Sequence, residues 1–252
     1  MDTDKPQHPL DPLVQKLRQW GRLDAMEADA VRALPYQIHR VRAGEYIVRD
    51  GDRPTRSCLL ISGFAFRQKL VADGGRSISA IHMRGDMVDL QNSLLGVADH
   101  SVQALTNCSV AFIPREAVKA LAFAHPNVGM AMWCDTLVDA SIFREWIANI
   151  ARRNAASRIA HLLCEFGVRF EAAGLAEKLA YELPMTQDQL ADCTGLTSVH
   201  VNRTLKSLEE SGDITRSVRH VAIADWDKIR RTADFQSRYL HLTGEAAVPA
   251  AA

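Results

Sequence analysis

The sequence lacks the features that mark membrane, secreted and metal-binding proteins. It has no run of about eighteen apolar residues, and its first residues, MDTDKPQHPLDPL, lack the basic-then-apolar pattern of a signal peptide. Its five cysteines are scattered, without a Cys-x-x-Cys pair or Cys/His pairs at metal-ligand spacing. We therefore expect a cytoplasmic protein with no membrane partner, no metal and buried, unpaired thiols.

Signatures of catalysis and of a strongly basic surface are missing as well. No Gly-rich phosphate loop and no nucleophile elbow occur, so we expect that the protein is not an enzyme and predict no cofactor. Thirty basic residues balance thirty acidic ones, which gives a formal net charge of zero. Any affinity for nucleic acid must therefore come from local clusters of positive charge.

Residues 186–206, TQDQLADCTGLTSVHVNRTLK, have the pattern of a helix-turn-helix. Thr186 and Gln189 are spaced as a capping box, which predicts that a short helix begins near Gln187. Gly195 supplies the left-handed residue that a sharp turn after this helix requires. A second helix is then predicted, capped by Thr197 or Ser198, and its inward stripe consists of Val201, Leu205 and Leu208.

The opposite face of this second helix suits the major groove of DNA. Arg203 can donate two bonds to guanine, Asn202 can pair with an adenine edge, and Val199 can meet a thymine methyl group. An ordinary pair of helices with a solvated polar face would have a similar pattern. The residues predicted to contact DNA in this motif are Thr186, Gln187, Thr197, Ser198, Val199, His200, Asn202, Arg203 and Lys206.

The next residues favour DNA binding, because 214–223 (ITRSVRHVAI) predict two short strands around a turn, the pattern of a wing. Arg216 and Arg219 lie near its tip and are predicted to contact phosphates, although arginines are common on any surface hairpin. Asp225 is expected to cap a last short helix. Residues 236–252 are expected to form a disordered tail.

The amino-terminal half has a different pattern. Residues 39–114 contain short alternating runs separated by glycine, which predict the antiparallel strands of a small barrel or jelly roll. Asp73-Gly74 is the strongest hairpin signal. Helical patterns bracket these strands, at residues 10–34 and 115–124.

Residues 127–153 predict a long helix whose apolar residues cover more than one stripe. Packing on one barrel needs an apolar face about 100° wide, so the extra breadth indicates a second partner. We expect a homodimer, although burial between two domains of one chain would give the same pattern. Asn154 is a candidate hinge after this helix. The predicted dimer interface consists of Val138, Ile142, Trp146 and Ile150.

Three motifs resemble those of Crp/Fnr-type transcription regulators, over residues 20–235. They are the Arg84-Gly85-Asp86-Met87 segment, R-x-x-x-x-x-R-I-A-x-L-L from Arg152 to Leu163, and P-M-T-Q-x-x-L-A-x-x-x-G-L-T-x-x-x-V-N-R from Pro184 to Arg203. The resemblance implies an α+β fold with an amino-terminal β-roll (jelly-roll-like) sensor domain, a long dimerisation helix and a carboxy-terminal winged helix-turn-helix.

The same resemblance sets the expected domains and partners. Residues 1–126 would form the cyclic-nucleotide-binding-like effector domain, 127–153 the dimerisation helix and 154–235 the DNA-binding domain. The implied partners are double-stranded operator DNA and a second copy of the chain, with RNA polymerase as a further candidate. In the family's motif the arginine of the reading helix contacts guanine, and the matching residue here is Arg203.

The sensor half departs from the cyclic-nucleotide-binding members of this family. Those members use a Gly-Glu pair for the ribose and an Arg-Ser pair for the cyclic phosphate, where this chain has Asp89-Leu90 and His100-Ser101. The mismatches predict that ordinary cAMP does not bind, and the effector stays unknown. His100 is expected to be a simple loop residue. The candidate effector pocket comprises Gly85, Asp86, Asp89, Leu90, His100, Ser101, Phe143 and Arg144.

These patterns together predict a sequence-specific, homodimeric DNA-binding regulator of transcription. The competing function is a cyclic-nucleotide-fold regulatory or protein-interaction module that does not read DNA. In that case Arg203 and Lys206 would be ordinary surface residues.

Overall fold

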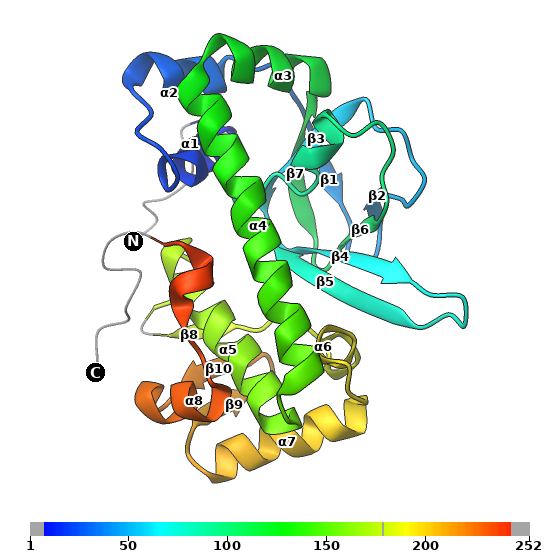
Figure 1. Ribbon diagram of the computed structural model, residues 1–252, viewed down its shortest axis with the longest axis vertical. Coiled ribbons are helices and arrows are strands. Elements are labelled where there is room, and N and C mark those ends of the chain that lie inside the picture. Colours follow the sequence, from blue (N-terminus) through cyan, green and yellow to red (C-terminus); the bar gives the residue numbers. More distant parts are fainter. Residues whose placement is uncertain (1–7, 178, 243–252) are drawn as a thin grey trace. The chain divides into compact units, whose positions relative to one another are not determined.

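The computed structural model describes residues 8–177 and 179–242. They form two compact units, and the division between them falls at Asp139 and Ala140, inside one long helix. This helix, α4 (Pro126–Arg152), gives its first half to one unit and its second half to the other (Figure 1). Among the residues described, no helix is both long enough and apolar enough to span a bilayer.

The first unit is a β-roll of two antiparallel sheets, which confirms the predicted sensor fold. The sheets have the strand orders β1-β7-β3 and β2-β6-β4-β5. The strands are β1 (Gln37–Val41), β2 (Tyr46–Val48), β3 (Arg56–Ser62), β4 (Ala65–Leu70), β5 (Arg76–His82), β6 (Ser101–Ala104) and β7 (Cys108–Pro114). The helices of this unit, besides the first half of α4, are α1 (Asp11–Arg18), α2 (Ala25–Arg32), α3 (Arg115–Ala124) and the short 3-10 helix η1 (Leu90–Ser93).

The hairpin between β4 and β5 forms where the sequence predicts it. Gly74 has a φ of +83°, a left-handed conformation that glycine adopts without strain. The side chain of Asp73 accepts a hydrogen bond of 2.8 Å from the Gly75 amide and holds the turn. Local turn chemistry thus sets the register of these two strands.

Two apolar cores hold the first unit together. One packs α1, α2, α3 and α4 against β3 and β7. The other lies inside the roll and includes Val48, Ala65 and Val102. In the paired strands Arg67 of β4 lies opposite Val102 of β6, which in turn lies opposite Val48 of β2. Because cross-strand partners share a face, the Arg67 side chain enters the interior of the roll with these apolar residues.

The second unit is a helical domain with a small sheet of order β8-β10-β9. Its elements, after the second half of α4, are α5 (Ala155–Ala172), β8 (Ala180–Glu182), α6 (Gln187–Thr194), α7 (Ser198–Glu210), β9 (Ile214–Ser217), β10 (His220–Ile223), α8 (Trp226–Ala233) and the 3-10 helix η2 (Ser237–Leu240). The strands of the predicted wing are confirmed. The strand β8 was not predicted, because three residues with one buried side chain, Tyr181, are too few to establish an alternating pattern.

The predicted start of the disordered tail, residue 236, is wrong. Residues 236–242 are ordered, with η2 in their middle, and the side chains of Phe235 and Leu240 are buried. Burial of these two apolar side chains stabilises the segment and offsets the conformational entropy that it loses when it becomes ordered. The remaining residues of the predicted tail, 243–252, lie outside the described part of the chain.

Candidate functional site

The first helix of the helix-turn-helix begins as its capping pattern predicts. The Thr186 side chain accepts from the Gln189 amide at 3.2 Å, and the Gln189 side chain accepts from the Thr186 amide at 2.8 Å. These reciprocal bonds satisfy two amides that a helix start leaves free. The capping box therefore fixes where α6 begins.

Residues of α4 and α5 contact the turn after α6. Gly195 has a φ of +62°, and a methyl group at its α-carbon would lie 3.2 Å from Ile150 of α4. Arg158 of α5 donates from Nη1 to the carbonyl of Thr194 at 3.1 Å and from Nε to the carbonyl of Arg153 at 2.8 Å. One guanidinium thus caps the end of α6 and binds the residue that follows α4.

The second helix, α7, presents the predicted polar face. Thr197 caps it by accepting from the His200 amide at 3.3 Å, and Val201, Leu205 and Leu208 are buried as predicted. The side chains of Arg203 and Lys206 are exposed. The inward stripe holds α7 against the unit while the other side stays open to solvent.

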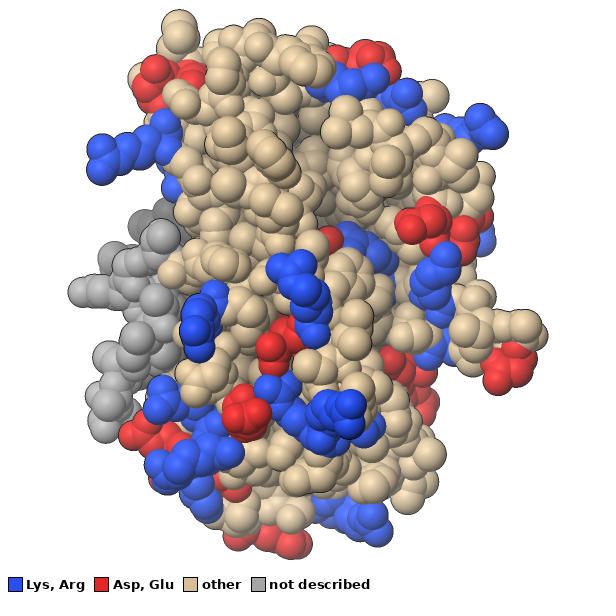
Figure 2. Space-filling view, in the orientation of Figure 1, with Lys and Arg blue, Asp and Glu red and all other residues tan. Residues whose placement is uncertain are grey.

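Two hydrogen bonds organise the exposed face. Gln187 of α6 donates from Nε2 to Oδ1 of Asn202 at 3.2 Å. Arg203 lies with Nη2 3.2 Å from Nε2 of His200, and this atom accepts in the tautomer whose proton is on Nδ1. The bond to Gln187 uses only the Oδ1 atom of Asn202, so its amide N–H groups can donate to a binding partner. Arg203 likewise has guanidinium N–H groups beyond the one near His200. Figure 2 shows Lys and Arg side chains interspersed with Asp and Glu over the second unit.

The wing requires one correction. Arg216, predicted to contact phosphate, is half-buried and forms an ion pair of 2.5 Å with Glu209 of α7. A paired cation offers a phosphate less net charge, and its pairing attaches the wing to α7. Arg219 at the same hairpin is exposed, beside the fully exposed tip residue Val218. The phosphate contact predicted for the wing is therefore retained for Arg219 alone.

The structure also contradicts part of the predicted dimer interface. Ile142 and Trp146 are buried within their own chain, and Trp146 donates from Nε1 to Glu165 at 2.9 Å. Side chains that their own unit covers cannot pack on a second copy. Val138 and Ile150 are half-buried. Instead, α4 exposes four large apolar side chains, and these are Met130, Trp133, Leu137 and Ile147.

The candidate effector residues separate into different places. Gly85 and Asp86 face α1, since a methyl group on Gly85 would lie 2.9 Å from the Pro12 carbonyl and Asp86 pairs with Lys16 at 2.9 Å. Phe143 and Arg144 belong to the second unit, where Arg144 donates to Ser141 on the same helix at 3.1 Å. Of the eight predicted residues, Asp89 and His100 form a polar cluster in the roll with Arg67, whose charge affects the pKa of both. Leu90 packs in the apolar core beneath the helices, and the Ser101 hydroxyl accepts from the Asp50 amide at 3.0 Å.

His100 is more than a loop residue. It is buried, its Nδ1 lies 2.6 Å from Asp99, and its Nε2 lies 3.3 Å from the amide of Gln91. Burial, and then the nearby Arg67 cation, lowers the pKa of His100 below its usual value. A neutral imidazole that donates from Nδ1 to Asp99 and accepts at Nε2 from Gln91 satisfies both bonds.

Sequence reasoning missed Arg67, the permanent cation of this cluster. Its side chain is buried, and it donates from Nη1 to Asp139 of α4 at 2.8 Å. The signal in the sequence is an arginine two residues after Ala65 in the strand AFRQKL, on the same face as that buried alanine, and such positions are normally apolar. Arg67 is therefore already held by a carboxylate of its own chain.

Asp89 is fully buried beside this cation. Its Oδ1 accepts from the Cys58 amide at 2.9 Å, while Oδ2 has no hydrogen-bond partner among the described residues. Burial raises the pKa of Asp89 to about 7, and the bond from Cys58 and the charge of Arg67 only partly oppose this shift. An anionic ligand in the roll would thus meet a buried acid as well as Arg67.

The Asp89 pKa predicts a pH-dependent stability. With a folded-state pKa near 7 and an unfolded value of 3.8, the wild type loses stability as pH rises between these values. Asp89→Asn keeps an acceptor for the Cys58 amide but does not ionise. Its gain over the wild type in the free energy of unfolding should be larger at pH 8 than at pH 5, on the order of 2 kcal/mol. Urea unfolding of both proteins at the two pH values measures this difference, and an equal gain at both values would show that Asp89 does not titrate in this range.

Comparison with known proteins supports this geometry. The cyclic nucleotide-binding domain model matches residues 38–125, and the Crp-like helix-turn-helix domain model matches residues 157–232. Together they cover well over half of the chain. The second match favours a DNA-reading function over a protein-interaction module.

Similar proteins of full length share both domains. The transcriptional activator protein FnrL of Cereibacter sphaeroides is 26% identical over 217 residues, 84% of this chain and 86% of that protein. The nitrogen fixation regulation protein FixK of Azorhizobium caulinodans is 28% identical over 174 residues, 69% of each chain. The structure of FixK2 from Bradyrhizobium japonicum has the same fold, with a TM-score of 0.72 and 23% identity over 79% of this chain and 98% of that one. The chain therefore belongs to the Crp/Fnr family of transcription regulators, which bind DNA through a helix-turn-helix.

Proposed function

We propose that the protein is a homodimeric regulator that binds a two-fold symmetric operator and does not depend on cAMP. The observation that carries this proposal is the exposed face of α7, where Asn202 and Arg203 are each held by a neighbouring side chain. Relatives such as FnrL are named activators, which supports activation of transcription with RNA polymerase as a partner. The relatives are regulators, which supports a role without catalysis.

Base reading and phosphate contacts are assigned to different residues. Arg203, Asn202 and Val199 lie on the exposed side of α7 and have the donor patterns and the methyl groups that base edges recognise. Thr186, Gln187, Thr197, Ser198 and Lys206 are assigned to phosphates near the two helix starts and along α7. His200 positions the Arg203 guanidinium.

Arg203→Ala should weaken binding to a selected operator by about 1–3 kcal/mol and relax the choice of base at one position, because a bidentate base contact is lost. Fluorescence anisotropy on operator variants measures both effects. Arg219→Ala should instead weaken binding to all duplexes and reduce the salt slope by about one unit. Arg216→Ala should reduce the salt slope less than Arg219→Ala, since Glu209 already engages that cation. Equal operator binding by wild type and Arg203→Ala would rule out this assignment.

The exposed apolar side chains of α4 support a subunit interface. Met130, Trp133 and Leu137 are 55%, 60% and 54% exposed and recur at helical spacing on one side of the helix. A stripe with this spacing is the seam along which two helices pack. We assign the interface to this stripe in place of Ile142 and Trp146.

Leu137→Asp should therefore yield monomers, because a second copy would bury an unpaired carboxylate at a cost of several kcal/mol. Met26→Asp, at an exposed apolar residue of α2, is the matched control and should leave the dimer intact. Sedimentation velocity on the three proteins measures the oligomeric state. A Leu137→Asp protein that remains dimeric would show that the interface lies elsewhere.

Micromolar cAMP should not bind at pH 7.5. Arg67 is paired with Asp139, His100 is neutral, and Leu90 offers no carboxylate to a ribose. Losing a charge-assisted pair to a desolvated phosphate typically costs about a hundredfold in affinity. Calorimetry with cAMP and cGMP tests this expectation. A low-micromolar dissociation constant that His100→Ala abolishes would instead make the roll a cyclic-nucleotide sensor.

A further inference from the structure

The segment after α8, residues 234–242, is named the C-terminal strap here. It lies beyond the stretch that matches the helix-turn-helix model, which ends at residue 232. It is nevertheless attached to the core of the second unit, where Phe235 is buried. The centroid of its ring lies 5.8 Å from that of Trp226 and 5.1 Å from that of His161. The strap is thus an addition to the matched domain that shares its core.

A buried polar network ties the strap to α4 and α5. The hydroxyl of Tyr239 donates to Glu165 at 2.8 Å, and this fully buried carboxylate also accepts from Trp146 at 2.9 Å and from Arg169 at 3.1 Å. Tyr239 also lies 3.1 Å from Nε2 of His161. Because the Tyr239 proton is directed to Glu165, Nε2 of His161 carries the proton in that bond.

Burial, and next the Arg153 cation, lowers the pKa of His161 to about 3, so the imidazole stays neutral across the physiological range. The network therefore joins the Glu165 carboxyl group to Arg169 and to neutral donors.

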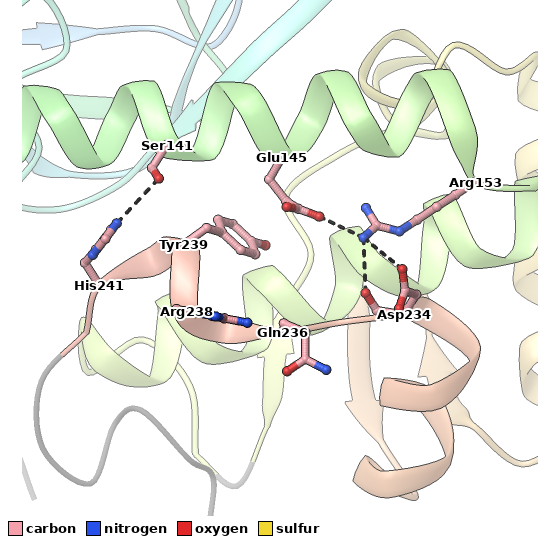
Figure 3. Close-up of a pocket in the computed structure, with 8 residues that line it drawn as sticks. All are labelled: Ser141, Glu145, Arg153, Asp234, Gln236, Arg238, Tyr239 and His241. Carbon is pink, nitrogen blue, oxygen red and sulfur yellow. Dashed lines mark hydrogen bonds and ion pairs between the residues drawn. The ribbon is translucent and has the colours of Figure 1, made fainter.

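A second tie holds the residue that joins α4 to α5. Arg153 directs Nη2 to Glu145 at 2.8 Å, to the Asp234 carbonyl at 3.1 Å and to the Asp234 carboxylate at 3.4 Å (Figure 3). These residues line a pocket of about 420 Å³, together with Ser141, Gln236, Arg238, Tyr239 and His241. The two carboxylates that line the pocket, Glu145 and Asp234, both pair with Arg153, and the Asp234 pair attaches the strap.

Arg153 in turn connects the strap to the DNA-reading motif. Its carbonyl accepts from Arg158, which also caps the carbonyl of Thr194 at the end of α6. Hydrogen bonds therefore link Asp234 to Arg153, Arg153 to Arg158, and Arg158 to the end of α6, just before the turn to α7.

We infer that the C-terminal strap positions the helix-turn-helix, with Asp234 and Tyr239 acting as positioning residues for DNA reading. They hold Arg153 and α5, and these hold the end of α6 from which α7 departs. A reading helix fixed in advance loses less freedom on binding its operator. Contacts to phosphate alone carry no sequence information and depend less on the exact direction of α7. Release of the strap should therefore reduce operator affinity more than affinity for unrelated duplexes.

The test uses the full chain and four variants, two of which are controls. Tyr239→Phe removes one hydroxyl, and a chain ending at Ala233 removes the whole strap. A chain ending at Leu242 keeps the strap and is the matched control for truncation, while Tyr36→Phe in the first unit is the control for the tyrosine change. Anisotropy with the selected operator and with a scrambled duplex gives the two affinities. Amide hydrogen exchange without DNA reports on residues 153–158 and 190–197.

The chain ending at Ala233 should bind the operator at least about tenfold more weakly, and Tyr239→Phe about threefold more weakly, with less than a twofold change on the scrambled duplex. Exchange at 153–158 should accelerate in both proteins, and neither control should change. This inference rests on operator binding by α7, but the exchange measurement does not involve DNA. Unchanged exchange at 153–158 in Tyr239→Phe would overturn it even if operator binding holds.

A double-mutant cycle separates positioning from general stability. Arg158→Gln removes the guanidinium that bonds to the carbonyls of Arg153 and Thr194, and so interrupts the link between the strap and α6. Adding Tyr239→Phe to this variant should therefore cost less than a further twofold in operator affinity. Full additivity of the two losses, or an equal loss on operator and scrambled duplex, would contradict a positioning role. Should the chain ending at Ala233 fail to fold, Tyr239→Phe and this cycle still decide the question.

Discussion

The guanidinium of Arg158 joins the parts of the second unit on which DNA reading depends. It binds the carbonyl of Arg153 after α4 and the carbonyl of Thr194 at the end of α6. The last carbonyls of a helix have no partner within it, so a cation there satisfies them and complements the helix dipole. Gly195 follows at once, packed on Ile150, and sets the direction in which α7 leaves. The end of the long helix and the end of α6, from which the turn to the reading helix starts, are thus joined by one side chain.

An ion pair of a buried arginine has a comparable role in the first unit. Arg67 donates to Asp139 on α4, and Asp89 lies nearby with one oxygen that has no partner among the described residues. A buried cation that lost its carboxylate would be strongly destabilising, so the pairing with Asp139 holds Arg67 in place. A ligand that bound Arg67 would have to compete with this carboxylate.

Local patterns in the sequence predicted much of the fold. The capping box at Thr186, the turn at Gly195 and the hairpin at Asp73-Gly74 depend on neighbouring residues, and the structure has each of them. The inward stripe of α7 follows from helical spacing alone. The candidate DNA face could be predicted for the same reason, since the residues of one helix face are close in sequence.

Features that depend on long-range contacts could not be predicted in this way. The pairing of Arg216 with Glu209, the burial of Trp146 against Glu165 and the entry of Arg67 into the roll each join separate elements. A broad apolar stripe on α4 does not show which of its sides is buried within the chain and which stays exposed. The ordered strap was missed because its apolar residues, Phe235, Tyr239, Leu240 and Leu242, are spread among polar ones.

We propose that α7 reads DNA sequence from a two-fold dimer. The most direct measurement is selection of binding sites from random duplexes by the purified wild-type protein without added cyclic nucleotide. We expect enrichment of inverted repeats whose half-site centres lie one helical turn apart, roughly 34 Å. Binding that enriches no sequence and varies only with salt concentration would contradict it.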